Sequence, residues 1–400
     1  MKMAGKRCLV VSVGTGVNET GAESVANAIV LSVNHFAADK VLFVITKQSA
    51  KTVLPIVVGK TGNDYEVCEI DDPDDINLIF KKLEPLFQKF RRQYHELIVD
   101  YTSGTKSMTG ALCVLGSLYE ANSLSYVTGE RNRGIVVKGT EKHLSINPYY
   151  ITISRRFTEA ISMFNKCQFE ACITILSRIT DETPLPEIVR KVIDLKFSAE
   201  AYSLWDRFEH NNAFVKVKSV VNPALNNNKA FLGKLTSSPD KEKFLIADLL
   251  NNASRRGDLE QKYDDAVARL YRTIEFIAQY RLKKYGITAT DNVLRKQIPP
   301  EFQKEFIFQN DKTQLALKNA WRLLDILGDK LGHNIPADKK LQNVLRKRNY
   351  SILAHGFEPV IKQDYRDLFE KVKEIAKEAV PDLDNLMIEA SFTKWIDDNP

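Results

Sequence analysis

Near the end of the chain, the segment RNYSILAHG holds three polar residues whose types suit acid–base chemistry on a phosphodiester: Arg348, Asn349 and His355. Seven residues on one α-helix make almost two turns, so Arg348 and His355 would leave the same face about 10 Å apart along the axis. Histidine, with a pKa near neutrality, suits removing a proton from a 2′-hydroxyl or protonating a leaving oxygen. The guanidinium suits the extra charge on a phosphorane, and Asn349 could orient either group. The three residues are candidates for cutting RNA without a metal ion.

The same spacing has a second interpretation, in which a surface arginine precedes a histidine near a helix C-terminus. The other histidines lie in contexts that offer no partner for chemistry: His35, His95, His143, His210 and His333. Basic pairs such as Arg255-Arg256 could follow an RNA backbone, but we expect them to lie on solvated helix faces. We assign chemistry only to the RNYSILAHG segment.

Two loops rich in glycine and hydroxyl residues form a second candidate site, for a ligand. One follows CLVVSV and holds Gly14, Thr15 and Gly16; the other follows ELIVDY and holds Thr102, Ser103, Gly104, Thr105 and Lys106. Small residues let a backbone approach a phosphate, hydroxyls can donate to its oxygens, and a lysine adds charge. Ligands of open parallel sheets bind beyond the carboxyl ends of the strands, where helices begin. The two loops therefore predict an anion cradle at one sheet edge.

Neither loop matches a standard nucleotide fingerprint. The third glycine of a dinucleotide motif is missing after Gly14 and Gly16, and the second strand ends in ITKQS without an acid for a ribose. Thr105 stands where a P-loop has the glycine before its lysine. The first loop could be merely a tight strand-to-helix turn and the second a helix cap. Their occurrence on one sheet edge favours a ligand.

The first 150 residues alternate strand-like and helix-like segments. Expected strands are 8–14, 40–46, 65–70, 96–102 and 123–129, with helices near 23–36, 74–90 and 105–121 and a closing hairpin over 131–147. Continuous Val/Ile/Leu runs joined by helices indicate a parallel sheet covered on both faces. We therefore expect a Rossmann-like α/β domain over 1–150, which senses a nucleotide-type ligand.

After Pro148 the pattern becomes helical. Apolar residues recur at three and four positions over 157–176, as in a helix hairpin, without a second copy at a fixed period. We expect a helical connector over 151–240 that ends in an Asn/Ser-rich loop over 221–240. A helical domain would then fill 241–400, with helices over 264–285 and 311–331, a loop at HNIPADKK, and a helix leading into 346–357.

The composition fits an ordinary globular protein of two or three domains, with 44% hydrophobic and 27% charged residues. No segment approaches a membrane-spanning helix, and the start of the chain lacks an export signal. Five cysteines without a C-x-x-C pair predict a reducing cytoplasm and no metal site. Of the net charge of +6, only one unit falls in residues 1–150, where 17 Lys+Arg face 16 Asp+Glu. The basic excess of the remainder permits an anionic partner such as RNA.

Taken together, SVGTG at 12–16, DYTSGTKSM at 100–108 and RNYSILAHG at 348–356 resemble the ancillary nucleases of type III CRISPR systems. Those proteins couple a CRISPR-associated Rossmann-fold (CARF) sensor to a HEPN ribonuclease domain. The resemblance covers the plan of the whole chain, and the middle helices carry least of it. It implies a HEPN-type fold for 241–400.

The resemblance also implies a homodimer whose paired sensors bind a cyclic oligoadenylate, the tetramer favoured over the hexamer, with no other cofactor, no DNA and no membrane. An even-numbered ring of identical nucleotides can present the same face to each protomer. Arg348, Asn349 and His355 of both chains would meet in one cleft and cut single-stranded RNA, leaving a cyclic phosphate and a 5′-hydroxyl. The activator would act by shifting the dimer toward the productive geometry. Thr15, Thr102 or Lys106 could assist slow cleavage of the activator itself.

Two rival functions stay open at this point. One is a ligand-responsive transcription regulator, although we find no helix-turn-helix with a basic recognition helix. The other is a phosphodiesterase that acts only on the cyclic activator and carries a helical domain without catalytic activity.

Overall fold

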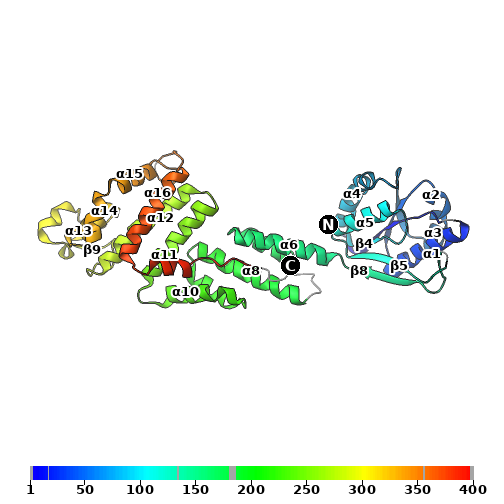
Figure 1. Cartoon of the computed structure of the whole chain (residues 1–400), viewed down its shortest axis with the longest axis horizontal. Helices are drawn as coiled ribbons and strands as arrows, with labels where there is room; N and C mark the ends of the chain where they lie inside the picture. Colours follow the sequence, from blue (N-terminus) through cyan, green and yellow to red (C-terminus); the bar gives the residue numbers. More distant parts are fainter. Residues whose placement is uncertain (1–2, 17, 133–134, 180–185, 355, 397–400) are drawn as a thin grey trace. The chain divides into compact units, whose positions relative to one another are not determined.

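The computed structural model describes residues 3–16, 18–132, 135–179, 186–354 and 356–396. The chain forms two compact units, Met1–Thr158 and Glu159–Pro400, each described below by itself (Figure 1). Among the described residues, no helix is both long enough and apolar enough to cross a membrane.

The first unit is built on a sheet of six strands among its described residues, in the order β3, β2, β1, β4, β5, β8. The strands are β1 (Met3–Ser12), β2 (Lys40–Ile45), β3 (Asp64–Glu69), β4 (Tyr94–Asp100), β5 (Ser123–Thr128) and β8 (Lys142–Ile146). β1 to β5 pair in parallel, and β8 closes the sheet antiparallel to β5. The apolar runs in β1 and β2 are buried on both faces, as expected for central strands of a covered sheet.

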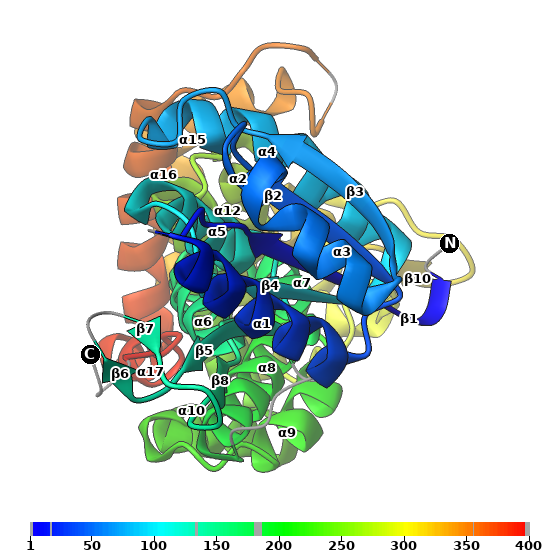
Figure 2. The same ribbon diagram turned by 90° about the vertical axis from the view of Figure 1, so that its right-hand side faces the viewer.

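Helices cover both faces of this sheet. α1 (Glu19–Phe36) and α3 (Leu54–Thr61) pack with β1 and β2 around a core that includes Val11, Ile29 and Phe43 (Figure 2). α4 (Ile76–Gln93) and α5 (Lys106–Leu118) cover the opposite face. A short helix, α2 (Ser49–Thr52), and a two-stranded pair, β6 (Arg131–Asn132) with β7 (Ile135–Val136), complete the unit. The expected Rossmann-like α/β fold is confirmed.

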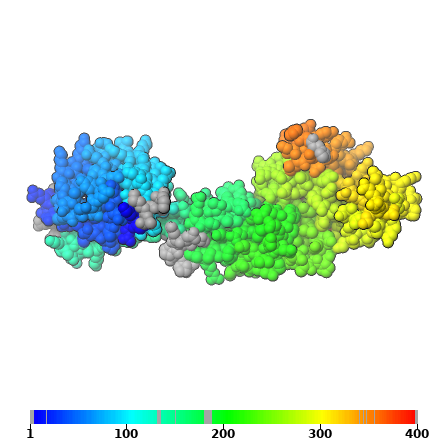
Figure 3. Space-filling view, turned by 180° about the vertical axis from the view of Figure 1, so that it is seen from behind, coloured from blue at the N-terminus to red at the C-terminus, as the bar shows by residue number. Residues whose placement is uncertain are grey.

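The second unit is helical apart from one short strand pair among its described residues. Its elements begin with α6 (Tyr149–Asn165), whose first residues belong to the first unit, and continue with α7 (Phe169–Ser177), α8 (Pro186–Asp206), α9 (His210–Lys218), η1 (Pro223–Leu225), α10 (Asn226–Ser237), α11 (Lys241–Ser254), the π-helical turn η2 (Arg255–Leu259) and α12 (Tyr263–Lys283). They end with β9 (Val293–Leu294), η3 (Arg295–Gln297), η4 (Pro300–Glu305), β10 (Lys312–Thr313), α13 (Leu317–Ile326), α14 (Lys330–Ala337), α15 (Lys339–Asn349), α16 (Lys362–Ala379) and α17 (Leu383–Glu389). In Figure 3 the yellow residues around position 310 and the orange residues around position 350 adjoin on this unit.

Three local expectations for this unit are wrong. The Asn/Ser-rich segment 221–240 contains a helix, α10, because Phe231, Leu232 and Leu235 recur at helical spacing and are buried. The expected helix 311–331 begins only at Leu317 and breaks at Gly328, which has a φ of +77°. The HNIPADKK segment is largely helical, since Asp329 caps α14 and Pro336 lies next to its last residue.

Candidate functional sites

The two glycine-hydroxyl loops of the first unit line one cavity of about 410 Å³. It lies beyond the carboxyl ends of β1, β2, β4 and β5, the edge expected from the parallel order. The predicted residues that line it are Gly14, Thr15, Gly16, Thr102, Ser103, Gly104 and Thr105. A cavity of this size is typical of small-ligand sites.

Ser103 holds the two loops together. Its hydroxyl donates to the backbone oxygen of Ser12 at 2.7 Å and accepts from the backbone N–H of Gly14 at 3.1 Å. The Ser12 hydroxyl donates in return to the backbone oxygen of Ser103. A Cβ on Gly14 would lie 3.0 Å from the backbone nitrogen of Gly104, whose own φ is +111°. The close approach of the loops therefore requires glycine at both positions.

Two of the loop hydroxyls are already committed to the protein, whereas others stay available. Thr105 is the N-cap of α5: its hydroxyl accepts from the backbone N–H of Met108 at 3.2 Å and donates to the backbone oxygen of Pro73. The Ser103 proton is likewise used. Thr102 only accepts, from the backbone N–H of Val127 at 2.8 Å, so its O–H can still donate. The first loop is also a tight turn, with Gly16 at φ +68°. The helix-cap and turn interpretations are thus correct locally, and the same loops still line a cavity.

Lys106 differs from the other predicted ligand residues because it does not line this cavity. It is the first residue of α5, its side chain is exposed, and no described carboxylate pairs with it. Sequence reasoning missed several lining residues: Ser24, Val25, Ala28, Thr46, Met108, Val127 and Val136. Thr46 could have been found, because it ends an expected parallel strand at the same edge. No sequence pattern indicates that the residues of α1 and β7 line the cavity.

A buried polar cluster supports the second loop from below. The Asp100 carboxylate is fully buried and accepts from the backbone N–H of Thr102 at 2.8 Å, from Ser32, and from Ser125 at 3.1 Å. Ser125 also hydrogen bonds to His143 Nε2 at 2.9 Å. The His143 ring stacks on His35 with centroids 4.1 Å apart. Burial, and secondly His35, lower the pKa of His143, while Asp100 opposes the shift.

The candidate site at the end of the chain is built differently from the single helix face expected. α15 ends at Asn349, and turns follow, so the expectation that one helix carries Arg348 and His355 is wrong. The Arg348 guanidinium lies 4.3 Å from the centroid of the Tyr271 ring on α12 and approaches Asn349 Oδ1 at 3.5 Å. Its Nε is buried without a hydrogen-bond partner among the described residues. His355 lies outside the described residues.

Helix α15 stops because the chain turns back sharply after it. The backbone N–H groups of Ser351 and Gly356 donate to the oxygens of Arg348 and Ser351, and Glu358 N–H donates to the Tyr350 oxygen at 3.0 Å. A Cβ on Gly356 would lie 2.0 Å from that Tyr350 oxygen, so only glycine fits. The glycine of the RNYSILAHG motif therefore has a steric role.

Tyr271 is a partner of Arg348 that sequence reasoning missed. Burial, and secondly Glu275, raise the pKa of Tyr271, whereas Arg348 opposes the shift. The ring faces the cation, an arrangement that favours one guanidinium orientation. Among the described residues, no group of three or more His, Cys, Asp or Glu side chains is arranged to hold a metal ion.

Comparisons with known proteins identify the second unit. The model of the Csm6 6H domain matches residues 154–246, and the model of the Csm6 HEPN domain matches residues 234–379. No curated protein matches the chain.

Solved structures show a similar fold. Enterococcus italicus Csm6 bound to cyclic hexa-2′-fluoro-hexa-dAMP aligns with a TM-score of 0.66 and 14% identity, over 96% of this chain and 98% of that one. Can2 from Sulfobacillus thermosulfidooxidans in complex with cyclic tetra-adenylate aligns with 13% identity over 62% of this chain and 68% of that one. Its TM-score of 0.26 is too low to indicate a shared fold. The two Csm6 models together span more than half of the chain and the shared fold covers both units, so the chain is a Csm6-type member of the CARF–HEPN proteins.

Proposed function

We propose that this protein is an endoribonuclease that cuts single-stranded RNA in the cytoplasm when a cyclic oligoadenylate binds its sensor, as part of CRISPR antiviral defence. The observation that carries the proposal is the contact between Arg348 and Tyr271 within the segment matched by the HEPN model. A half-buried guanidinium with an unpartnered Nε, placed beside a tight turn, suits binding of a phosphodiester.

The proposed reaction needs no metal ion. His355 would transfer the proton of the 2′-hydroxyl, Arg348 would stabilise the charge that develops on the phosphorus centre, and Asn349 would orient the attacking group. Attack of the 2′-oxygen on the adjacent phosphorus breaks the bond to the 5′-oxygen, so the products are a 2′,3′-cyclic phosphate and a 5′-hydroxyl.

The proposed sensor is residues 1–150, the connector 151–240 and the nuclease 241–400. The activator's phosphates would meet the loop N–H groups and the Thr15 and Thr102 hydroxyls, with Lys106 adding charge from the start of α5. We expect the tetramer ring to bind more tightly than the hexamer. The E. italicus relative was solved with a six-membered ring, so both rings belong in one titration.

The active form would be a homodimer in which two copies of Arg348, Asn349 and His355 share one cleft. Support comes from apolar side chains that are solvent-exposed in one copy of the turn after α15: Tyr350, Ile352, Leu353 and Phe357 are 56%, 62%, 47% and 90% exposed. A cluster of this kind next to a site is typical of an interaction surface.

Cleavage of a fluorogenic single-stranded RNA in EDTA tests the proposal. We expect cleavage only with added cyclic oligoadenylate, and a loss of about 10²- to 10⁴-fold in Arg348→Ala and His355→Ala, the range for removal of acid–base and charge-stabilising groups. Arg346→Ala is the matched control, since Arg346 is exposed on the same helix and should keep full activity. Activity that survives in either site variant would overturn the assignment. If the protein degrades the cyclic oligoadenylate and leaves the RNA intact, the result would instead support the phosphodiesterase function.

A further inference from the structure

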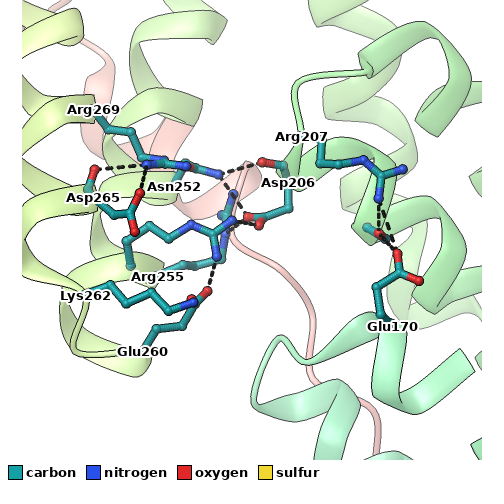
Figure 4. Close-up of polar contacts among 11 residues, drawn as sticks. Glu170, Asp206, Arg207, Asn252, Arg255, Glu260, Lys262, Asp265 and Arg269 are labelled. Atoms are coloured by element: carbon teal, nitrogen blue, oxygen red, sulfur yellow. Dashed lines mark hydrogen bonds and ion pairs between the residues drawn. The ribbon is translucent and has the colours of Figure 1, made fainter. Parts of the chain in front are cut away.

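A buried group of charged residues joins α8 to the π-helical turn η2 in the second unit (Figure 4). Asp206, the last residue of α8, accepts from Arg255 Nε at 2.8 Å and also pairs with Arg256. Arg256 pairs in turn with Glu260, which Lys262 reaches at 2.8 Å. The expectation that Arg255-Arg256 is a solvated basic pair is wrong, because their side chains are only 7% and 17% exposed.

This ion-pair group has more cations than carboxylates. Arg255, Arg256 and Lys262 face only Asp206 and Glu260 in the contacts described, and the side chain of Lys262 is 60% exposed, so the surplus cation is the solvated one. The Nη2 atom of Arg255 is buried and has no hydrogen-bond partner among the described residues. An unpaired buried donor on a cation is costly, so natural proteins rarely leave one without a ligand or water.

The π-helical turn gives Arg255 its position. α11 continues into the wider turn η2 instead of ending, and Gly257 lets the turn approach α16 so closely that a Cβ there would lie 2.2 Å from the Tyr365 ring. Such turns are rare in proteins and are frequent at functional sites.

Arg255 lines a cavity of about 170 Å³ that lies outside both sites described above. Its guanidinium carbon is 3.8 Å from the centroid of the Phe392 ring, so the ring lies over one face of the guanidinium. Asn165, Tyr202 and Lys394 form further parts of the wall.

The neutral polar groups of this wall are largely engaged in holding the segment after α17. Tyr202 donates to Asn228 at 2.6 Å and accepts from the backbone N–H of Thr393 at 3.0 Å. The Asn165 amide makes hydrogen bonds of 3.0 Å and 2.8 Å with the backbone of Trp395. Lys394 is exposed at the cavity and no described carboxylate pairs with it. Among the described residues, the Nη2 atom of Arg255 and the ammonium of Lys394 therefore remain without a partner at this wall.

We propose that this cavity binds a small tetrahedral oxyanion of the phosphate class, either free phosphate or the terminal group of a small phosphomonoester. A water takes about 30 Å³ in the liquid, so the cavity has room for one such anion with water beside it. The anion would accept hydrogen bonds from Arg255 Nη2 and from the Lys394 ammonium. Because Phe392 and Lys394 lie on the segment after α17, occupancy also ties that segment to η2.

Binding of inorganic phosphate to the full-length protein tests the proposal, measured by calorimetry and by thermal unfolding at constant ionic strength. Lys394→Ala removes an exposed wall cation without disturbing the core, and we expect it to weaken phosphate binding about tenfold, as for loss of one charge-assisted hydrogen bond. Arg255→Lys should abolish saturable binding. Lys262→Ala is the matched control: it belongs to the ion-pair group but not to the cavity wall, and should bind like the wild type.

The variants Lys106→Ala and Arg348→Ala each change one of the two other candidate sites. Both should bind phosphate as tightly as the wild type, which would exclude binding at those two sites. Methyl phosphate distinguishes a phosphomonoester ligand from free phosphate. If methyl phosphate binds as tightly as inorganic phosphate, the ligand is a phosphomonoester; if methyl phosphate does not bind, the ligand is free phosphate. A stabilisation that chloride reproduces at equal ionic strength would overturn the proposal. So would unchanged binding in Lys394→Ala, an outcome that is readable even where the Arg255 variant fails to fold.

Discussion

At the scale of single residues, the sensor cavity depends on how closely its two loops approach. Ser103 uses its proton and one lone pair to fasten the loops, and Thr105 uses its hydroxyl to cap α5. The groups left for a ligand are backbone N–H groups and a few hydroxyls such as that of Thr102. Backbone donors are effective only at the right spacing, so the distance between the loops controls affinity.

Gly14→Ala should therefore weaken activator binding about tenfold or more, because its Cβ would lie 3.0 Å from the backbone nitrogen of Gly104 and force the loops apart. Isothermal titration with cyclic tetra- and hexaadenylate measures the effect. Gly59→Ala is the control: Gly59 lies in α3 with nothing within 4 Å of an added Cβ, and alanine there should stabilise the helix by about 1 kcal/mol. Equal affinity in both variants would contradict the role of the loop spacing.

At the scale of elements, the edge strand β8 is joined to α1 through a partly buried histidine. His143 on β8 stacks on His35 of α1 and hydrogen bonds to Ser125, which Asp100 also holds. The cluster lies directly below the second loop. Its protonation state therefore influences how firmly α1, β4, β5 and β8 pack together.

We expect acid to weaken this packing. The pKa of His143 is lowered in the folded protein from its ordinary 6.5, so the unfolded chain takes up the proton first as pH falls. Stability from neutral His143 is then fully present above about pH 6.5 and is lost as pH falls toward the lower folded pKa. His143→Gln should flatten the fall of the melting temperature between pH 7 and 5, whereas His95→Gln, on an exposed position of β4, should not. Parallel curves for wild type and His143→Gln would refute the linkage.

The sequence predicts elements well where one pattern dominates, and less well where distant packing decides. The strands at 40–46 and 96–102 were expected within two residues, because buried parallel strands are continuous apolar runs. Asn226–Ser237 was expected as a loop, since local Asn preference was weighed above the buried Phe231 and Leu235. The end of α15 at Asn349 depends on the contact of Gly356 with Tyr350, which residue spacing cannot reveal.

The candidate sites follow the same division. Glycines and hydroxyls at strand ends were expected together, because parallel topology alone brings them to one edge. The sequence did not predict Tyr271, which faces Arg348 from α12, or the cavity-lining residues of α1 and β7. Their positions depend on how the elements pack in three dimensions.

At the scale of the whole molecule, the proposed dimer has a surface whose chemistry can be tested. The turn after α15 exposes four large apolar side chains beside Arg348, and Phe357 is 90% exposed. Isolated exposed apolar residues are ordinary, but a group next to a site is not.

Phe357→Asp should weaken the dimer and abolish RNA cleavage while leaving activator binding to the sensor intact, because a charge would be buried at the contact. Analytical ultracentrifugation gives the mass and the fluorogenic assay the activity. Ile307→Asp introduces the same charge at a residue that is 86% exposed in the segment between η4 and β10, and should remain dimeric and active. A Phe357→Asp protein with wild-type mass and activity would remove this surface from the proposal.

Because two arginines share the Asp206 carboxylate, the residues that join α8 and η2 should differ in how well they tolerate substitution. If one arginine is replaced, two cations and two carboxylates remain. If Asp206 is neutralised, the guanidinium groups of Arg255 and Arg256, which are 7% and 17% exposed, lose their shared carboxylate. A saturation library selected for folded protein should thus retain many replacements at Arg256 and almost none at Asp206. Among natural variants, the acid should be the residue that changes last.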